Sequence, residues 1–344
     1  MSDSKVTVSA DDAKRPIYAG IDVGGTNIKF GLVDDNGQTV AYDTIRTESE
    51  RGPEDAVARM AAQVNKMIAG AGLDSNDVPI IGLATPGTMD IAAGLILEPS
   101  NLPTWRHFAI REELKKASGK PVLYANDAGA AGYGEYWCGC GRQYPSLVLL
   151  TLGTGVGAGI ILNGVSIDGE HSHGAECGHN IIDMHENARI CSCGQRGHLE
   201  AYCSATGIVK RIEEKLKTAR STSLRQRIDD GESLTTLMLA QEAEKGDGFS
   251  LEMIDETAVY LGVGITTIVH TIDPSIVVLG GAVNFGGKET ELGQRFLSKV
   301  TDEFRRRAMP VLAENTVLDF AILGGDAGYV GAAGLAREEY LRQS

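Results

Sequence analysis

Side chains that bind metal ions gather in the stretch from Gly174 to Glu200. This stretch contains the pairs Glu176 and His179, Cys191 and Cys193, and His198 and Glu200. Cysteine thiolates and neutral imidazoles are the ligands that Zn²⁺ prefers in closed, four-coordinate sites. Gly194 and Gly197 fall where a metal loop must turn sharply to bring ligands from both sides to one ion. The stretch therefore predicts a loop braced by zinc.

Glu176 and Glu200 have a different chemistry from the thiols and imidazoles around them. A carboxylate beside a metal loop can accept hydrogen bonds from hydroxyl groups, which is how a sugar would be held. We therefore interpret the loop as one that orients a polyol site. A purely structural zinc ribbon with acidic residues at its surface is the alternative. A disulfide framework fits less well, because two cysteines separated by one residue are poorly spaced to pair with each other.

Two glycine-rich turns could bind phosphate. Gly24-Gly25-Thr26 follows a strand predicted over 17–23, and Gly153-Thr154-Gly155 follows one predicted over 146–152. Neither matches the strand-to-helix phosphate loop, because each is followed by a second strand. Glycine backbone lets N–H groups approach phosphate oxygens, and each threonine adds a hydroxyl donor. One such turn also occurs in ordinary hairpins, but two of them, with the pair Gly280-Gly281 after a strand over 276–279, favour phosphate binding.

The elements around these turns repeat. A strand, a turn with glycine and threonine, a second strand and a turn ending in Asn-Gly occur first over 17–37 and again over 146–164. Further strands are predicted over 80–84, 121–125 and 317–323. Helices are predicted over 54–70, 111–118, 128–137 and 288–307, across most of 205–271 and at the C-terminus. The repeat implies two related α/β halves, each offering a glycine turn to a shared cleft.

The composition is that of a globular enzyme, with 42% hydrophobic and 23% charged residues in a chain of 344. A net charge of −14 argues against nucleic acid or an anionic membrane as a partner, so phosphate would be held by local N–H groups. Six cysteines without a signal peptide indicate a cytoplasmic protein. The uncharged stretch 146–165 is too rich in glycine for a membrane helix. Residues 1–15 are expected to form a disordered tail.

The motifs together resemble those of the ROK family, which groups sugar kinases with sugar-responsive repressors. They are DVGGTNIK (22–29), TPG (85–87), NLPTW (101–105), ND (126–127), LGTGVGAG (152–159), ECGHN (176–180), CSCGQRGHLE (191–200) and VVLGGAV (277–283). The resemblance extends in order from Ile17 to the end of the chain. It implies an α/β fold of the actin-like, duplicated ribonuclease H-like type, an ATPase fold of two domains with a cleft between them. The smaller domain would comprise 16–125 and 330–344, and the larger one, with the zinc knuckle, 126–329.

The resemblance also implies the site residues. ATP would be bound by Asp22, Gly24, Gly25, Thr26, Asn27, Lys29, Gly153, Thr154, Gly155, Gly157, Gly280 and Gly281. The hexose would contact Gly87, Asn101, Asn126, Asp127, Glu176, His179 and Glu200. Asp127 would be the general base. Its place after an apolar strand and at a helix start is consistent with this role, since the helix N-terminus favours the ionised carboxylate. A helix cap is the alternative for Asp127.

The family's knuckle most often has a third cysteine where this chain has His198. An imidazole is a competent ligand, so the resemblance implies a Cys₂His₂ zinc site of His179, Cys191, Cys193 and His198. Cys203 could replace His198, although we interpret Cys203 and Cys177 as buried free thiols and Cys138 and Cys140 as packed ones. Because the phosphate turns lie on other strands, loss of zinc is expected to weaken glucose binding before ATP binding.

The expected reaction is transfer of a phosphoryl group from ATP, with Mg²⁺, to the 6-hydroxyl of glucose. Fructose, mannose or an N-acetylhexosamine as acceptor, and polyphosphate as donor, are alternatives. A sugar-sensing repressor is a third possibility, but about sixteen polar residues before the first strand are too few for a helix-turn-helix. The resemblance also suggests a homo-oligomer, either a dimer or a tetramer.

Overall fold

The computed structural model describes residues 5–99, 101–218 and 221–343. These residues form two compact units. The first contains the chain up to Gln143, Gly159–Ala175 and the residues from Ile322 onward, and the second contains Tyr144–Ala158 and Glu176–Ala321.

The first unit is built on a five-stranded sheet in the order β3-β2-β1-β4-β7. β1 pairs antiparallel with β2 and β2 with β3, whereas β4 is parallel to both β1 and β7. Its strands are β1 (Tyr18–Val23), β2 (Asn27–Val33), β3 (Thr39–Arg46), β4 (Ile81–Thr85) and β7 (Val122–Asn126), and a small hairpin is formed by β5 (Met89–Asp90) and β6 (Leu95–Ile96). Its helices are α1 (Pro53–Gly70), α2 (Ile110–Ser118), α3 (Asp127–Trp137) and α11 (Ala327–Gln343).

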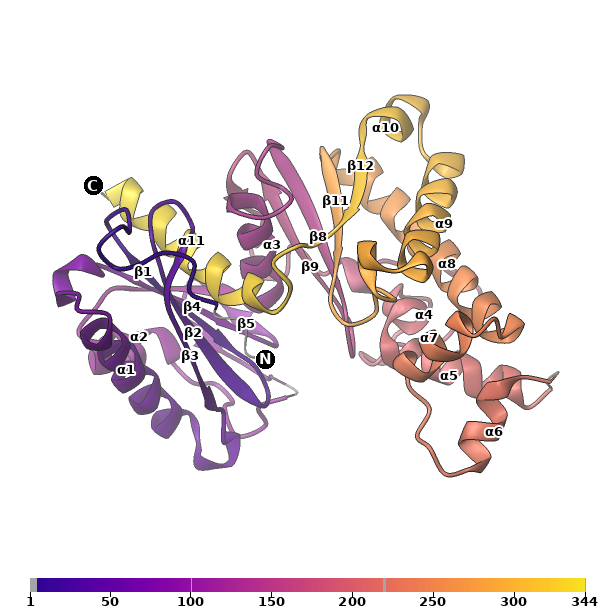
Figure 1. Cartoon of the computed structure of the whole chain (residues 1–344), viewed down its shortest axis with the longest axis horizontal. Coiled ribbons are helices and arrows are strands. Elements are labelled where there is room, and N and C mark those ends of the chain that lie inside the picture. The colour runs from indigo at the N-terminus through magenta and orange to yellow at the C-terminus, as the bar shows by residue number, and fades with distance from the viewer. Residues whose placement is uncertain (1–4, 100, 219–220, 344) are drawn as a thin grey trace. The chain divides into compact units, whose positions relative to one another are not determined.

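Helices cover both faces of this sheet (Figure 1). The inward-facing residues of β1, Ala19, Ile21 and Val23, pack in one apolar core with residues of α1 and α2. The opposite face is covered by α11. The backbone of α11 comes close to β1 and β4 because these strands carry glycine there: a β-carbon on Gly20 would overlap Tyr329 O, and one on Gly82 would overlap Ala332 O. The carboxyl ends of β4 and β7 therefore belong to a well-packed scaffold.

The second sheet repeats the first in its strand order, β10-β9-β8-β11-β12. β11 is parallel to β8 and β12, and β10 is antiparallel to β9. The strands are β8 (Ser146–Leu152), β9 (Val156–Leu162), β10 (Val165–Ser166), β11 (Ile276–Gly280) and β12 (Val317–Phe320). β1 and β8 thus occupy the same central position, and each is followed by a glycine turn. The duplication predicted from the repeat of turns is present in the topology, and the uncharged stretch 146–165 forms the β8–β9–β10 strands.

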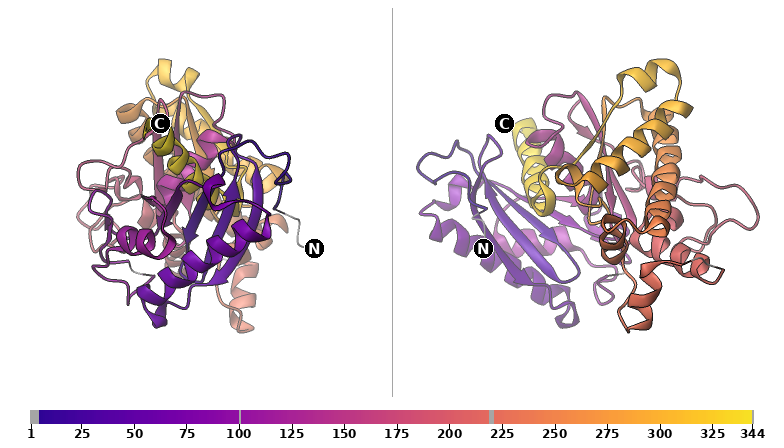
Figure 2. Two further views of the ribbon diagram at one scale, coloured as in Figure 1. Left: turned by 90° about the vertical axis from the view of Figure 1, so that its left-hand side faces the viewer. Right: turned by 45° about the vertical axis from the view of Figure 1, so that its right-hand side comes forward.

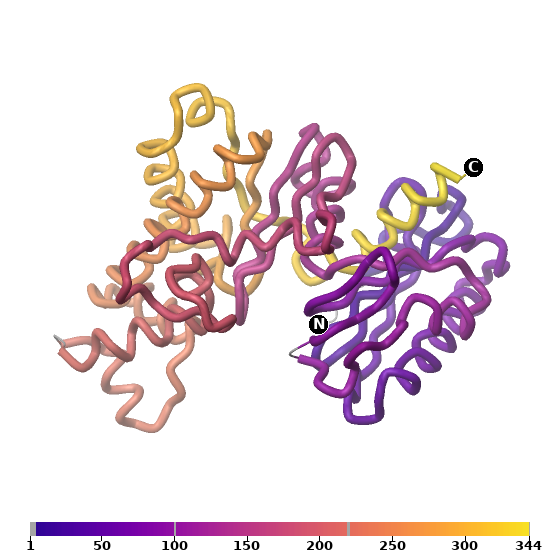
Figure 3. The backbone as a smooth tube through the Cα atoms, turned by 180° about the vertical axis from the view of Figure 1, so that it is seen from behind, coloured from indigo at the N-terminus to yellow at the C-terminus, as the bar shows by residue number. Residues whose placement is uncertain are grey.

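The second unit adds helices to this sheet: α4 (Glu200–Cys203), α5 (Ala205–Leu216), α6 (Ser223–Asp229), α7 (Thr236–Glu244), α8 (Gly248–Ile272), α9 (Glu291–Arg307) and α10 (Pro310–Asn315). α8 and α9 run side by side (Figure 2). The 3₁₀ turns of the chain are Ser49–Arg51, Ser75–Asp77, Cys177–His179, Gly287–Glu289 and Gly324–Asp326. Between β10 and α4 the backbone is a long irregular loop (Figure 3).

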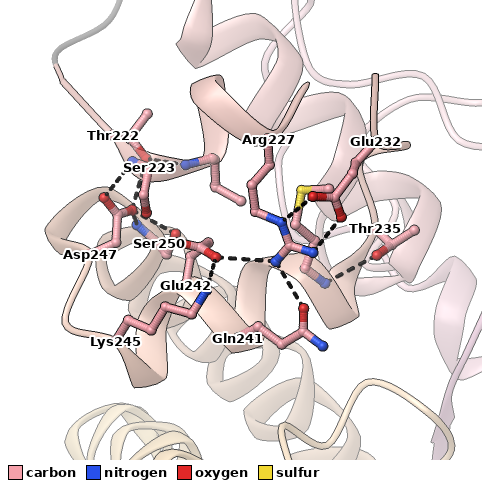
Figure 4. Close-up of polar contacts among 12 residues, drawn as sticks. Thr222, Ser223, Arg227, Glu232, Thr235, Gln241, Glu242, Lys245, Asp247 and Ser250 are labelled. Carbon is pink, nitrogen blue, oxygen red and sulfur yellow. Dashed lines mark hydrogen bonds and ion pairs between the residues drawn. The ribbon is translucent and has the colours of Figure 1, made fainter. Parts of the chain in front are cut away.

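A buried carboxylate holds α6, α7 and the following turn together (Figure 4). Glu242 is 2% exposed and accepts hydrogen bonds from Arg227 (3.1 Å) and Lys245 (2.7 Å). These hydrogen bonds outweigh burial and lower the pKa of Glu242 to about 2. The same Arg227 guanidinium also contacts Glu232 and Gln241. The network therefore fixes the helical part of the second unit and contains none of the predicted site residues.

The division into units differs from the expected domain boundaries. We expected the first domain to stop at residue 125 and to resume at 330, but α3 and the start of α11 belong to the first unit. The reason is the close packing of these two helices on each other: a β-carbon on Gly134 would lie 2.6 Å from Ala327 O, and one on Gly331 would overlap Ala130 O. Residues 159–175 also belong to this unit.

The expected disordered tail over 1–15 needs correction for residues 5–15. The Thr7 N–H donates to Thr39 O (2.8 Å), and the Lys14 N–H donates to Asp34 Oδ2 (3.0 Å). Val8, Ala10 and Ala13 pack against the first core, so this segment has apolar partners that its polar composition did not suggest. Residues 1–4 lie outside the described part of the chain. No helix among the described residues is long and apolar enough to cross a membrane.

Candidate functional site

In the first unit the predicted general base lies at the carboxyl end of β7. Asn126, the last residue of β7, caps α3: its Oδ1 accepts hydrogen bonds from the N–H groups of Ala128 (2.9 Å) and Gly129 (3.1 Å). Asp127 occupies the first helical position, is partly exposed, and its Oδ1 accepts from the Ala128 N–H (2.8 Å). The side-chain cap is therefore provided by Asn126. Asp127 therefore lies beside the cap, at the end of α3 where the helix dipole is positive.

Gly87 is brought to the same edge of the sheet. Thr85 pairs in register with Asn126, and its Oγ1 lies 2.7 Å from the hydroxyl of Tyr124. Gly87 has a φ of +91°, and a β-carbon there would lie 2.5 Å from the α-carbon of Pro99. A larger residue would be strained and would push this loop away, so the glycine is required for the close approach of the two loops.

The first glycine turn lies beside another predicted sugar contact. A β-carbon placed on Gly25 would lie 3.4 Å from Cβ of Asn101. Thr47, just after β3, holds the turn: its N–H donates to Thr26 O (2.9 Å) and its hydroxyl donates to Gly24 O (2.7 Å). Gly25, Thr26 and Asn27 are exposed. The turn thus combines a rigid support with an accessible backbone.

Asp22 and Lys29 stand opposite each other on β1 and β2. The Asp22 carboxylate packs against Gly328, in the first turn of α11, where a β-carbon would overlap it. Burial raises the pKa of Asp22, and the neighbouring Lys29 opposes this shift. The Lys29 ammonium donates to Gly325 O (2.7 Å) and so ties the hairpin to the turn before α11.

In the second unit the Gly153–Gly155 turn is supported from several sides. Its own Gly153 N–H donates to Gly155 O (2.9 Å). Gly280 pairs in register with Thr151, and Gly281, with a φ of +88°, lies so close to Leu152 that a β-carbon would overlap it. The pair Gly280-Gly281 therefore borders the strand that leads into the turn. Gly157 lies just beyond, in β9.

The four predicted metal ligands converge within the second unit. One ligand atom from each of His179, Cys191, Cys193 and His198 can be chosen so that all lie within 4.8 Å of one another. His179 Nδ1 lies 3.2 Å from His198 Nδ1 and 3.6 Å from Cys191 Sγ, and Cys193 Sγ lies 3.3 Å from His198 Nδ1. A tetrahedron with Zn–N of about 2.0 Å and Zn–S of about 2.3 Å has edges of roughly 3.3–3.8 Å. The donor set is therefore that of a closed zinc site, and these three distances lie close to the edges of such a tetrahedron.

Backbone hydrogen bonds shape residues 191–198, the metal loop, which carries three of the four ligands. The Cys191 N–H donates to Gln195 O (2.8 Å), and the Gly194 N–H donates back to Cys191 O (3.0 Å). Gly194 and Gly197 have φ values of +86° and +79°, as the predicted sharp turns require. Burial raises the pKa of the Cys191 thiol to about 11, and burial together with His179 lowers the pKa of His198. The imidazole is therefore ready to bind a metal, whereas the thiol needs the cation itself to become a thiolate.

The other cysteines lie outside this group. Cys203 is fully buried, and its Sγ lies 3.7 Å from Thr257 O in α8. Cys177 is also buried, and neither it nor Cys138 or Cys140 belongs to the group of metal-ligand atoms found among the described residues. The geometry thus favours His198 over Cys203 as the fourth ligand.

Glu200 joins the metal loop to the glycine turn. Its Oε1 accepts from the hydroxyl of Ser192 and lies 3.3 Å from Cys191 Sγ, while its Oε2 accepts from the Val156 N–H (3.1 Å). Burial opposes the charge, but these hydrogen bonds outweigh it and lower the pKa of Glu200. The other predicted sugar carboxylate, Glu176, lies 3.7 Å from His179 Nε2 and is half-exposed. Both acids therefore lie beside the metal group, and their contact with a sugar stays a prediction.

Sequence reasoning missed three residues of this arrangement. Ser192 was passed over as the spacer of the Cys-x-Cys pair, and Val156 as an apolar residue within the LGTGVGAG motif. Thr206, whose hydroxyl donates to Thr154 O (3.0 Å), belongs to no motif. Their contacts depend on where the irregular loop and α5 return to the sheet. Only a hydroxyl between two metal ligands could have signalled Ser192.

Known proteins are similar to this chain over nearly its whole length. The model of the ROK family matches residues 18–339. The chain is 32% identical over 322 residues to a glucokinase of Halalkalibacterium halodurans, covering 94% of this chain and 95% of that one. It is 33% identical over 319 residues to a glucokinase of Thermotoga maritima, with coverages of 93% and 96%. Among solved structures, a ROK family glucokinase from Streptomyces griseus, in complex with glucose and AMPPNP, matches with a TM-score of 0.72, 29% identity and coverages of 94% and 99%.

Proposed function

The chain belongs to the ROK family, and on this premise we propose that it phosphorylates glucose at the 6-hydroxyl with ATP as donor. It is an ATP-dependent hexose kinase, the class to which its glucokinase relatives belong. The observation that carries the choice of a sugar as acceptor is the contact of Glu200 with both the metal loop and the Val156 N–H of the glycine turn. A kinase for a polyol needs hydroxyl-binding acids next to a phosphate-binding turn, and the contact of Glu200 with Val156 supports this part of the proposal.

Asp127 acts as the general base in this proposal. Its carboxylate accepts the proton of the 6-hydroxyl while the oxygen attacks the terminal phosphoryl group, and the bond to the leaving ADP breaks. Phosphoryl transfer depends mainly on positioning and charge neutralisation, so a carboxylate of ordinary basicity is sufficient. The Mg²⁺ that accompanies ATP belongs to the donor substrate and supplies positive charge.

The remaining predicted residues hold the two substrates. Hydroxyl groups of glucose bind to Asn101, Asn126, Glu176, His179 and Glu200, with Gly87 shaping the loop beside them. The Asn126 Oδ1 is used by the helix cap, so its amide N–H₂ group is the part that can donate to the sugar. Phosphates of ATP bind to the exposed backbone of the two glycine turns together with Asp22, Asn27 and Lys29, and Gly280-Gly281 borders the adenosine.

Zinc has a structural role in this proposal. His179, Cys191, Cys193 and His198 would hold the ion, and a site closed by four protein ligands would have no open position for substrate. When bound, the ion fixes the loop from which Glu176 and Glu200 reach the sugar. His179 would then bind the metal through Nδ1 and leave Nε2, which lies 3.7 Å from Glu176 Oε2, for a sugar hydroxyl.

A panel of acceptors and donors tests the proposal. Purified protein is assayed with ATP or polyphosphate against glucose, fructose, mannose and N-acetylhexosamines, and kcat/KM is compared. We expect the highest value for glucose with ATP. A higher kcat/KM for another hexose would assign that sugar instead, and a preference for polyphosphate would replace ATP as donor.

A homodimer or tetramer stays a prediction, which sedimentation equilibrium would test.

A further inference from the structure

The Gly153–Gly155 turn and the start of β9, here taken together as the Gly153–Gly157 turn, are held by residues 200–206, which follow the metal loop in the chain. The Ala205 N–H donates to Gly153 O (2.8 Å), the Thr206 hydroxyl donates to Thr154 O (3.0 Å), and Glu200 accepts from the Val156 N–H (3.1 Å). Within this turn, two carbonyl groups and one N–H group are thus occupied by residues 200–206. The conformation of the turn therefore depends on where this segment lies.

The metal loop fixes that segment through one side chain. Ser192 lies between the two cysteine ligands, and its hydroxyl donates to Glu200 Oε1. The Cys191 thiol also approaches this oxygen, but a thiol that binds a metal is deprotonated and cannot donate a hydrogen bond. When the site holds zinc, Ser192 is the donor that remains between the loop and Glu200. Contacts therefore run from the Cys-Ser-Cys loop through Ser192 and Glu200 to Val156.

We propose that Ser192 and Glu200 couple the metal site to the phosphate turn, so that loss of zinc weakens nucleotide binding as well as sugar binding. Ser192 is a positioning residue here: it contacts neither substrate and acts through Glu200. The inference rests on the proposed phosphate role of the Gly153–Gly157 turn. It differs from the expectation based on sequence, in which loss of zinc weakens glucose binding before ATP binding because the phosphate turns lie on other strands.

A bracing role alone would give a different result. If the metal only stabilised the fold, its removal would lower the melting temperature and leave the dissociation constant for nucleotide unchanged below that temperature. Coupling through Ser192 instead makes the effects of chelation and of Ser192→Ala on nucleotide affinity non-additive. Once the hydroxyl is absent, removing zinc has little further effect on nucleotide affinity. Non-additivity of this kind is what a double-mutant cycle measures.

The experiment measures the dissociation constant of a non-hydrolysable ATP analogue by calorimetry, without sugar, for the full chain. Four proteins are compared: wild type, Ser192→Ala, Thr206→Val and the exposed control Ser298→Ala, each with zinc and after chelation. Zinc content and circular dichroism are recorded for every sample. Thr206→Val is the matched control, because it removes a hydrogen bond to the same turn without touching the metal loop.

We expect chelation to weaken nucleotide binding of the wild type about tenfold, the size expected for loss of a hydrogen bond to a charged group. Ser192→Ala should retain one zinc per chain, bind nucleotide about as weakly as the chelated wild type, and lose its response to chelation. Thr206→Val should also bind more weakly but keep the full response. Ser298→Ala should behave as wild type.

Two results would overturn the proposal. One is a wild type that binds nucleotide equally well with and without zinc while remaining folded, whatever the variants do. The other is an equal effect of chelation in wild type and Ser192→Ala. The variant Gly155→Val distinguishes a failure of the coupling from a failure of the proposed phosphate role. If this variant binds the ATP analogue normally, the turn does not bind phosphate at all. If it binds weakly while zinc has no effect, only the coupling is wrong.

Discussion

The two sheets share one strand order, but the loops that leave them carry different chemistry. In the first sheet, β4 ends at Thr85 and leads to Gly87, and β7 ends at Asn126 and leads to the candidate base Asp127. In the second sheet, β10 is followed by the metal loop and by helices α4–α8, before the chain returns to the sheet in β11. The two sheets thus serve as similar scaffolds, and the candidate functional side chains lie in the different connections between their strands. The first unit is expected to contribute the general base, and the second to contribute the metal group beside Glu176 and Glu200.

The two glycine turns show the same contrast in their support. The first is held by one residue of its own sheet, Thr47, through two hydrogen bonds. The second is held by Glu200, Ala205 and Thr206, which follow the metal loop in the chain. The first turn should therefore be independent of zinc, and the second should not.

The largest effect is expected in the first unit, from Asp127→Asn. This change should lower kcat by about 10²–10⁴, the range for loss of a general base, and leave glucose binding nearly intact. Steady-state kinetics and calorimetry with glucose measure the two quantities, with the exposed Asp11→Asn as control. Near-normal turnover in the folded variant would remove Asp127 from the mechanism.

The next largest effect is expected in the second unit, from Gly155→Val. A β-carbon there would lie 2.5 Å from Glu200 Oε2, and overpacking of this kind costs about 1–3 kcal/mol. The KM for ATP should rise about tenfold or more, and more than the KM for glucose. Gly248→Val is the control, because a β-carbon on Gly248 meets no atom within 4 Å. A rise confined to the KM for glucose would contradict a phosphate role for this turn.

Thr47→Val tests the support of the first turn. Losing the hydroxyl bond to Gly24 O should cost about 1 kcal/mol and raise the KM for ATP roughly fivefold. The comparison predicts that this effect is the same with and without zinc. Measuring the KM for ATP before and after chelation tests it, and a variant whose response to zinc differs from that of wild type would show that the two turns are not supported separately.

The smallest effect on kinetics is expected from Glu242→Gln in the network of Figure 4. It should lower the free energy of unfolding by about 1–3 kcal/mol at neutral pH, because hydrogen bonds to a buried charge are lost. The pKa of Glu242 is lowered to about 2, so its contribution is present above its ordinary pKa and is lost as the pH falls toward 2. The difference in melting temperature between variant and wild type should therefore be smaller at pH 3 than at pH 7. A large change in either KM would show that the network reaches the site.

Local patterns in the sequence predicted the strands, the glycine turns and the metal ligands. Alternation of apolar residues predicted β1, the recurrence of a strand before a glycine turn predicted β8, and paired cysteines and histidines identified His179 and Cys191. These features depend on residues that are near one another in the chain.

Features that depend on distant contacts could not be predicted. The unit boundaries depend on α3 packing against α11, about 200 residues later. The order of residues 5–15 depends on Thr39 and Asp34. The link from Ser192 to Val156 depends on a carboxylate, Glu200, that the sequence offered only as a sugar ligand.

The most direct test of the account identifies the product of the reaction. Wild type and Asp127→Asn are each incubated with glucose, ATP and Mg²⁺, and the phosphorylated species are assigned by ³¹P nuclear magnetic resonance. The account predicts glucose 6-phosphate and ADP from the wild type, and almost none from the variant over the same time. Inorganic phosphate without a sugar phosphate, a phosphate on another hydroxyl, or equal product from Asp127→Asn would contradict it.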